Sequence, residues 1–297
     1  MSTTEHNFEP MTTGMVLDRS FRLYVDNFVL MVGLSAILNV PILFLSFLFT
    51  AGRIDPLHLN AASVIAIVVG VILFLVAAII VAPMIAGATA LAVSDIYLGK
   101  IASAGAVLSA AWRRLWTLLK TQIVVGLILA GLMLLAAIVL GIVGGIFSFI
   151  SPVIAIVGMI LGFLAIMVLV IQLFLSYALI APIVMIEHSD SGREIRNRSW
   201  RLVEGQRWKV FLVFLVLVLI QLLISGGILG VELSAAAGLG TGSASIISAV
   251  LNGIASILLT PLSAISVTLL YYDFRIRKEG FDLEMLSQSI SGTATDA

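Results

Sequence analysis

Long runs without one charged side chain dominate the pattern of this sequence. A helix needs about 20 apolar residues to cross the hydrocarbon core of a bilayer. One run, residues 121–186, is long enough for two crossings, and Pro152 is well suited to the first turn of the second one. The charge-free runs are 28–52, 61–94, 121–186, 210–231 and 233–272.

These runs predict an all-α integral membrane protein with six transmembrane helices. The stretch Ser234–Ser245 is rich in small residues and glycine, and we expect it to be a loop. Residues 14–286 then form one membrane domain, while 1–13 and 287–297 are expected to be a disordered arm and tail. The predicted crossings are 28–52, 62–94, 121–147, 152–186, 210–231 and 246–271.

The basic residues predict the orientation. Fifteen of the 16 Lys and Arg residues lie in the N-terminal arm, in the second and fourth loops, and in the tail, whereas Arg53 alone lies in the opposite loops. The positive-inside rule then places both termini in the cytoplasm. We expect a multi-pass protein of a bacterial plasma membrane.

Composition agrees and narrows the chemistry. Hydrophobic residues make up 61% of the chain and charged residues 11%, with no net charge. A soluble domain has about 25% charged residues. Zero net charge gives no field that attracts nucleic acid. The chain has no cysteine and three scattered histidines, so we expect no catalytic residue, no metal site and no cofactor.

Three short segments resemble one another, and each stands just before an odd-numbered crossing. They contain the pairs Phe21-Arg22, Trp112-Arg113 and Trp200-Arg201, each preceded by serine or alanine. The even-numbered crossings share an internal proline, at Pro83, Pro182 and Pro261. A threefold repeat of one cytoplasmic helix and two crossings is therefore possible.

The first two of these segments are amphipathic at helical spacing. Such a helix lies in the membrane interface with its apolar face down. We expect Phe21 and Trp112 on the apolar faces, with Arg22 and Arg113 opposite. The third segment has a smaller apolar arc, and it either stands out from the membrane or contacts a partner. That arc is Ile195, Leu202 and Val203.

A few strongly polar side chains lie within the crossings. Their ordinary role is to form hydrogen bonds between helices, worth about 0.6 kcal/mol each. The other possibility is a polar path for a solute, lined by Asn39, Gln172 and Gln221. Gln122 and Asn252 complete the set.

The segment Tyr271–Leu286 concentrates charge directly after the last apolar run. We expect Tyr271 and Tyr272 at headgroup depth, and Gly280 as the helix C-cap. We expect the bases of this segment to face anionic lipid headgroups. These bases are Arg275, Arg277 and Lys278.

The acids of the same segment need partners. Our hypothesis is that Asp273 and Glu279 pair with the arginines of the repeated segments. The alternative is local pairing, in which Asp273 reaches Arg277 one turn along the helix. The arginines of the hypothesis are Arg22, Arg113 and Arg201.

The stretches "LDRSFRLYVDNF", "NRSWRLVEGQRWKVF" and "YYDFRIRKEGFDLEML" resemble the bacterial glycerophosphoryl diester phosphodiesterase membrane domain family. The resemblance covers residues 14–286 and implies a membrane-integral domain without a catalytic part. The catalytic barrel of that family uses a His-Arg-Gly element, and this sequence has no His-Arg pair. The resemblance therefore implies no catalytic residue.

Two functions remain open. The first is a non-enzymatic membrane protein that organises a protein partner or the bilayer through its amphipathic helices. The alternative is a transporter or channel for a small or lipid-like solute. The neutral crossings favour the first, because a proton-driven carrier usually holds a titratable residue at depth.

Overall fold

The structure is a computed structural model that describes residues 10–51 and 61–280. Within these residues the chain is helical and contains no strand. The helices are α1 (Thr13–Asp26), α2 (Phe28–Ala51), α3 (Ala61–Tyr97), α4 (Ala104–Ser148), α5 (Pro152–Ser176), α6 (Ile180–Ile186), α7 (Gly192–Val203), α8 (Arg207–Leu239) and α9 (Thr241–Glu279).

Six segments are long and apolar enough to cross a membrane, so the chain is an all-α, multi-pass membrane protein. Each coincides with one predicted crossing, although most extend beyond the predicted limits. They are Phe28–Phe47, Ile67–Tyr97, Ala104–Ser148, Pro152–Ile186, Arg207–Leu239 and Gly242–Glu279.

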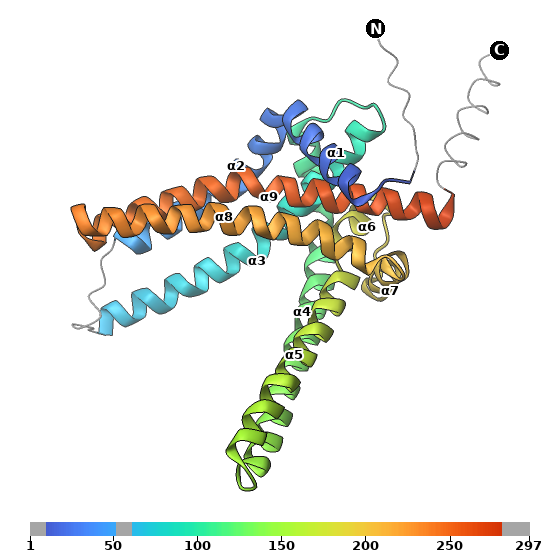
Figure 1. Ribbon diagram of the computed structural model, residues 1–297. Helices are drawn as coiled ribbons and strands as arrows, with labels where there is room; N and C mark the ends of the chain where they lie inside the picture. Colours follow the sequence, from blue (N-terminus) through green and yellow to red (C-terminus); the bar gives the residue numbers. More distant parts are fainter. Residues whose placement is uncertain (1–9, 52–60, 281–297) are drawn as a thin grey trace, which may run out of the picture.

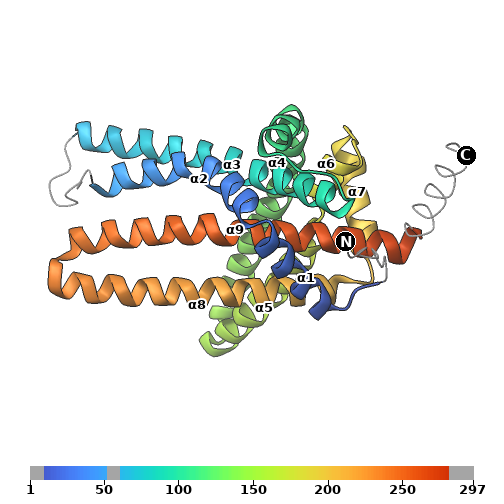
Figure 2. The same ribbon diagram turned by 90° about the horizontal axis from the view of Figure 1, so that it is seen from above.

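The long helices form two diverging arms (Figure 1). In the four-helix arm, α2, α3, α8 and α9 lie side by side, with α9 packed between α2 and α8. The hairpin arm consists of α4 and α5, and it leaves the four-helix arm in a clearly different direction. Figure 2 shows the same divergence from above, since the four-helix arm lies in the plane of view while the hairpin arm is foreshortened.

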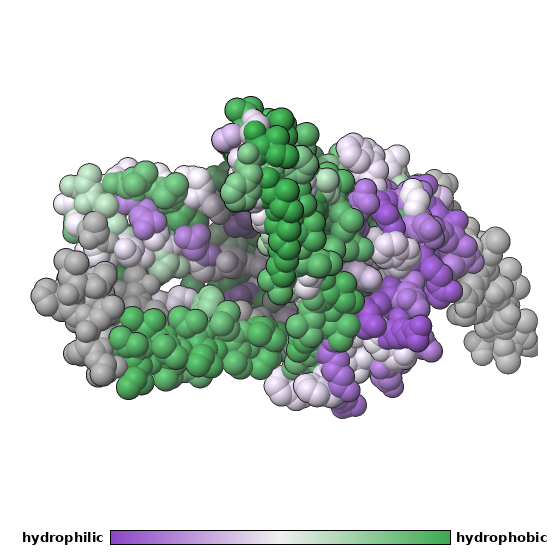
Figure 3. Space-filling view, turned by 90° about the horizontal axis from the view of Figure 1, so that it is seen from below, coloured by the Kyte–Doolittle hydropathy of each residue, from purple (hydrophilic) through white to green (hydrophobic). Residues whose placement is uncertain are grey.

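The arms meet at a region that we call the collar. It comprises Met11, α1, α6, α7, the first turns of α4 and α8, and the end of α9 (Figure 1). Polar surface gathers at this end, whereas the exposed faces of the arms are largely apolar (Figure 3). Most of the fully buried large side chains also lie here, including Tyr271, Tyr272 and Phe274. The collar is therefore the packed core of the protein.

The prediction of a loop over Ser234–Ser245 is wrong. Helix α8 continues to Leu239, and α9 begins at Thr241. Alanine is the best helix former, so the alanines of this stretch extend the helix. The reversal needs only Gly240, whose φ of 85° is open to glycine without steric cost.

The second amphipathic segment is not a separate helix. It forms the first turns of α4, which runs unbroken from Ala104 to Ser148 over 45 residues. The first and third segments are separate helices, α1 and α7. A single residue, Asn27, divides α1 from α2, and residues 204–206 divide α7 from α8.

The fourth predicted crossing, 152–186, is interrupted. Helix α5 ends at Ser176 and α6 begins at Ile180. Pro182 explains the break, because a proline ring clashes with the carbonyl four residues earlier, here that of Ala178. Pro83 and Pro261 instead stay inside continuous helices. Pro41 lies inside α2, so an internal proline does not distinguish the even-numbered crossings.

The N-terminal arm, predicted to be disordered over 1–13, is packed at its end. Met11 is buried, and Thr12 caps α1 by accepting a hydrogen bond from the backbone N–H of Met15. Residues 1–9 and the whole predicted tail, 287–297, lie outside the described residues.

Candidate functional site

The buried carboxylate of Asp273 organises the first of two polar clusters in the collar. It accepts hydrogen bonds from the Met11 N–H and from Lys209 Nζ, both at 2.6 Å. Lys209 Nζ also donates to the Met11 carbonyl at 2.5 Å, and an Arg277 guanidinium nitrogen donates to that carbonyl at 2.6 Å. We call this group of four residues the Met11 clamp. It joins the N-terminal segment to α8 and α9.

The charges of the clamp compensate one another. The Asp273 side chain is fully buried, and a buried carboxylate is stable only when it is paired and hydrogen-bonded. Lys209 supplies one positive charge from α8, and Arg277 Nε supplies the other at 3.1 Å from the same carboxylate. Because Arg277 stands one turn along α9, the predicted local pair is present. The long-range partner of Asp273 is Lys209, not one of the arginines of the hypothesis.

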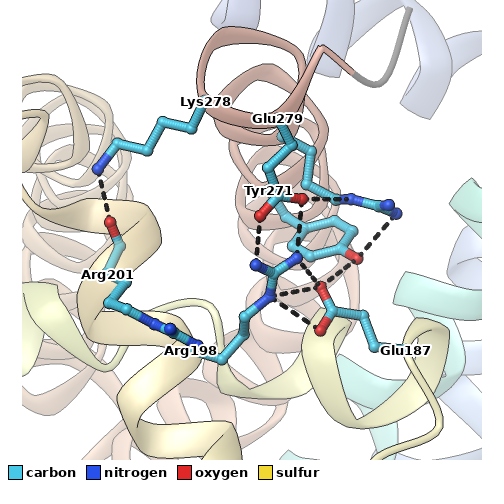
Figure 4. A network of polar contacts seen from close by, with 7 residues as sticks. Glu187, Arg198, Arg201, Tyr271, Lys278 and Glu279 are labelled. Atoms are coloured by element: carbon cyan, nitrogen blue, oxygen red, sulfur yellow. Dashed lines mark hydrogen bonds and ion pairs between the residues drawn. The ribbon is translucent and has the colours of Figure 1, made fainter. Parts of the chain in front are cut away.

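Arg198 of α7 organises the second cluster, which we call the Arg198 network (Figure 4). Its guanidinium donates to both carboxylate oxygens of Glu187 at 3.0 Å and also pairs with Glu279. Tyr271 donates its hydroxyl hydrogen to Glu187 at 3.0 Å. Arg275 Nε reaches Glu279 at 3.3 Å from one turn earlier on α9. The network thus joins α7 and the residue after α6 to the end of α9.

The two carboxylates keep Arg198 charged. Burial alone would lower the pKa of its guanidinium, but the hydrogen bonds to Glu279 and Glu187 outweigh burial and hold the pKa above its ordinary value. A forked pair of this kind has a fixed geometry as well as a favourable energy. The Arg198 network therefore positions α7 rather than offering a proton for chemistry.

Lys278 fastens the end of α7 to α9. Its ammonium group donates to the backbone carbonyl of Arg201 at 2.5 Å (Figure 4). It also donates to the backbone carbonyl of Glu204 at 2.6 Å. The last carbonyls of a helix have no hydrogen-bond donor within the helix. The ammonium group of a lysine can donate hydrogen bonds to them. Arg201 thus contributes its backbone to the site.

The structure corrects the expectation for the end of α9. Tyr271 and Tyr272 are fully buried, so neither presents its ring to the lipid headgroups as a residue of an aromatic belt would. The Tyr272 ring stacks on Tyr97 at 4.7 Å, and its hydroxyl lies 2.8 Å from Ser94 Oγ. The predicted C-cap is present: Gly280 has left-handed geometry and donates its N–H to the Ile276 carbonyl.

The bases of this segment also differ from their expected role. Arg275, Arg277 and Lys278 were expected to face lipid headgroups, but all three donate to groups within the collar. The long-range pairing of Glu279 with the third segment is present, although its partner is Arg198 instead of Arg201.

The other arginines of the hypothesis lie elsewhere. Arg22 pairs with Asp18 one turn away at an exposed site. Arg113 is exposed, and its side chain has no ion pair among the described residues. Neither arginine reaches Asp273 or Glu279. Helix α1 packs on α9 through other side chains, such as Ser20, while α4 packs on α3, α5, α6 and α7.

The three segments share one register of buried positions. The serine or alanine before each aromatic is fully buried, and so is the aliphatic residue one turn earlier. The aromatics themselves differ: Phe21 and Trp112 are exposed, whereas Trp200 is half-buried. The register pairs are Val16 with Ser20, Val107 with Ala111, and Ile195 with Ser199.

The apolar faces of the first two segments combine buried and exposed residues. Val16 and Val107 are buried, whereas Phe21 and Trp112, which were expected on apolar faces turned toward the membrane, are exposed. Ser20 is buried and forms a hydrogen bond with Ser266 at 3.0 Å. In α7 the predicted apolar arc is buried, together with Ser199.

Within the described residues, hydrogen bonds do not join the three side chains of the alternative polar path to one another. The Asn39 amide donates to Ser35 in its own helix, and Gln221 donates to Ser225 in the same way. Gln172 is exposed on α5. A hydrogen bond inside one helix satisfies a polar group without any neighbour, so these side chains are not drawn together.

A cavity lies where the two arms meet. Its volume is about 400 Å³, and its walls come from α3, α4, α5, α6, α8 and α9. Most of the lining is apolar, with Gln122 and several hydroxyl groups among it. Within the described residues no group of three or more His, Asp or Glu side chains could hold a metal ion.

The sequence analysis did not identify three central residues of the site. Met11 acts through its backbone, which no side-chain pattern reveals. Lys209 and Arg198 stood among six basic residues of one loop with nothing to distinguish them. The signal that was available is the position of Lys209, the last charge before an apolar run, where a helix carries it into the core.

The fold and these two ion-pair clusters define a six-span, all-α membrane protein whose polar chemistry is concentrated at one end. Residues 28–273 match the family model described as Domain of unknown function (DUF7847), and the chain belongs to that family. No curated protein and no solved structure matches it. The likeness to the glycerophosphoryl diester phosphodiesterase membrane domain remains a prediction.

Proposed function

We propose that this is a non-enzymatic protein of a bacterial plasma membrane, and that it organises the bilayer around its two arms, with the collar and both termini on the cytoplasmic side. The observation that carries the proposal is the divergence of the hairpin arm from the four-helix arm (Figure 1). Both arms expose apolar side chains, which water does not solvate. Both must therefore lie in the same bilayer, with lipid between them.

The cytoplasmic placement of the collar rests on charge and on tryptophan. The basic residues of the described chain gather there, as the positive-inside rule requires of a cytoplasmic end. Trp112, Trp116 and Trp208 are exposed at the base of the arms. Exposed tryptophan is typical of the membrane interface, so these residues support an interfacial position for the collar.

The proposed repeat accounts for the construction of the collar. In each segment the same two positions, one helical turn apart, are buried, although the side chains differ. Each segment would then act as the base of one hairpin: α2 with α3, α4 with α5, and α8 with α9. With the three bases held together at the collar, two hairpins pack into the four-helix arm and the third, α4 with α5, diverges from them.

The shape predicts a preference for curvature. The molecule is narrow at the collar and wide at the tips of the arms, so it fits a membrane in which the collar faces the concave side. In vesicles, the collar should point inward more often as the vesicle becomes smaller. Ser191→Cys on the collar and Ser151→Cys at the hairpin tip report this orientation, because the natural chain has no cysteine.

The test reconstitutes each variant into large and small vesicles and applies an impermeant thiol reagent. The shielded fraction of Ser191→Cys should rise in the small vesicles, and that of Ser151→Cys should fall. Equal shielding in both sizes would contradict the proposal. Equal shielding is expected if the protein only holds a protein partner and does not respond to membrane curvature.

A transporter for a lipid-like solute is the second candidate, and the cavity between the arms favours it. A carrier must open its site to both sides of the membrane in turn. Flux of a fluorescent lipid across vesicles that contain the protein, above the flux of empty vesicles, would support this alternative.

A further inference from the structure

The cavity between the arms has the chemistry of a site for a hydrocarbon chain. Ala82, Phe214 and Ala264 supply apolar walls, and Gln122 and Ser263 supply isolated polar groups. All of these residues belong to segments long and apolar enough to span the membrane. Ligand sites with mostly apolar walls and a few polar groups have volumes of about 300–1,000 Å³, and this cavity of about 400 Å³ falls in that range.

The cavity continues as a groove along the four-helix arm. A second hollow of about 210 Å³ lies between α8 and α9 and shares Phe214, Thr260 and Ser263 with the first. It extends the space toward Gln221. The combined shape is elongated and follows the helices, as an acyl chain of the bilayer does.

An unpaired cation stands on the collar side of this cavity. The buried Nε of Arg207 has no hydrogen-bond partner, and its side chain forms no ion pair within the described residues. The guanidinium lies over the Trp200 ring at 4.6 Å, and that ring lies 6.1 Å from the ring of Tyr177, which lines the cavity. Aromatic rings thus connect the cation to the cavity wall.

Helix geometry places Arg207 in line with the cavity. Arg207 and Phe214 are seven residues apart on α8, so they lie on nearly the same face and about 10 Å apart along the axis. A buried guanidinium nitrogen without an acceptor is costly, which makes a missing acceptor the natural explanation. Phosphate is the group that arginine binds best, through paired hydrogen bonds.

We propose that the protein binds one phospholipid at the junction of its arms, with an acyl chain in the cavity and the phosphate on Arg207. The Arg207 nitrogens donate to the phosphate oxygens, and the apolar walls exclude water from the chain. The inference goes beyond the proposed function, because organising a bilayer does not require a discrete lipid site. Its failure would leave the vesicle-size result untouched.

The first test fills the cavity. The protein, in mild detergent, is exposed to a phosphatidylglycerol with a photoreactive diazirine in one acyl chain, and the labelled peptides are identified by mass spectrometry. Wild-type labelling should fall on the cavity lining. Ala264→Phe and Ala82→Phe should each reduce it strongly, whereas Ala137→Phe, on an exposed face of α4 outside the cavity, should not.

The proposal would be overturned if the two cavity variants were labelled as strongly as the wild type, or if labelling spread evenly over the exposed helices. Ala82 is exposed, so its substitution does not threaten the core, and this keeps the test valid should Ala264→Phe fail to fold.

The second test isolates the phosphate contact. A photoreactive diacylglycerol with the same chains lacks the phosphate. Arg207→Gln should weaken labelling by the phospholipid about tenfold, since one charge-assisted contact is lost, and leave labelling by diacylglycerol unchanged. Arg113→Gln, an exposed arginine at the collar, serves as the matched control. An equal effect on both lipids, or on neither, would show that Arg207 does not bind the phosphate.

Discussion

The carboxylate of Asp273 accepts a hydrogen bond from the backbone N–H of Met11 at 2.6 Å, across 262 residues of sequence. The contact holds the N-terminal segment against the last helix. Because the Met11 carbonyl accepts hydrogen bonds from Lys209 and Arg277 at the same time, both backbone polar groups of this one residue are fixed by side chains of α8 and α9.

We expect Asp273→Asn to be strongly destabilising. The substitution leaves Lys209 buried and charged without its anionic partner, and breaking a buried ion pair in this way costs about 3–5 kcal/mol. The measurement is thermal unfolding in detergent. Asp18→Asn is the matched control, since it removes an acid whose local partner, Arg22, is exposed, and it should change stability by less than about 0.5 kcal/mol. Similar losses for the two variants would show that the Met11 clamp contributes little.

The contact between Glu279 and Arg198 should appear as a coupling in a double-mutant cycle. Glu279→Gln and Arg198→Gln each leave a partly buried charge without its partner, so the double variant should lose less than the sum of the two. We expect a coupling above the 0.3–0.5 kcal/mol or so of an exposed pair within a helix.

The control for this cycle is Arg201→Gln. The Arg201 contact that this network uses is its backbone carbonyl, which the substitution retains. Its coupling to Glu279→Gln should be close to zero. A coupling for Arg201 as large as that for Arg198 would mean that the described pairing is not the one that stabilises the collar.

The sequence was sufficient for the crossings and insufficient for the contacts among them. A charge-free run of 20 residues has few alternatives in a bilayer, so the six segments could be placed from composition alone. The reversal at Gly240 was missed because a helix of small residues and a loop of small residues have the same composition. The hydropathy pattern placed Trp112 on an apolar face, but it could not show which residues of that face pack against protein and which are exposed, as Trp112 is.

The sequence predicts where the helices lie better than it predicts which side chains pair with one another. Arg198 and Arg201 lie three residues apart and carry the same charge, so no pattern separates the one that reaches Glu279 from the one that does not. The divergence of the hairpin arm was also outside the reach of sequence, since apolar helices pack or separate according to shape, and lipid is as apolar as leucine.

Close packing between α2 and α9 depends on Gly253. A Cβ built at this position would overlap the side chain of Leu43 on α2. Gly253→Ala should therefore destabilise the protein by about 1–3 kcal/mol, as overpacking does, and Leu43→Ala in the same chain should relieve much of that loss. Thermal unfolding of the single and double variants measures the relief.

Gly227→Ala is the control for this pair. It also places a methyl group inside a long helix, but no atom lies near its Cβ. Since alanine favours helix over glycine, we expect no loss, or a gain of up to about 1 kcal/mol. Equal losses at the two glycines would show that the effect is not packing against Leu43.

The hairpin arm should cross the membrane completely. In intact cells, Ser151→Cys at its tip should react with an impermeant thiol reagent, while Ser191→Cys at the N-cap of α7 should react only after permeabilisation. The same experiment applies to Leu57→Cys, whose position lies outside the described residues. If Ser151 and Ser191 were accessible from the same side, the tip of the hairpin arm would not reach the opposite face of the membrane.

The Met11 clamp has a consequence for the order of events during synthesis. Met11 is translated first, and Asp273 follows 262 residues later. At about 5–20 residues per second, this delay is roughly 13–50 seconds. Throughout that interval Met11 and the docking face of α1 have no α9 to bind. The hairpins must therefore enter the membrane while the collar is still open, and the first segment to be translated is among the last to reach its native position.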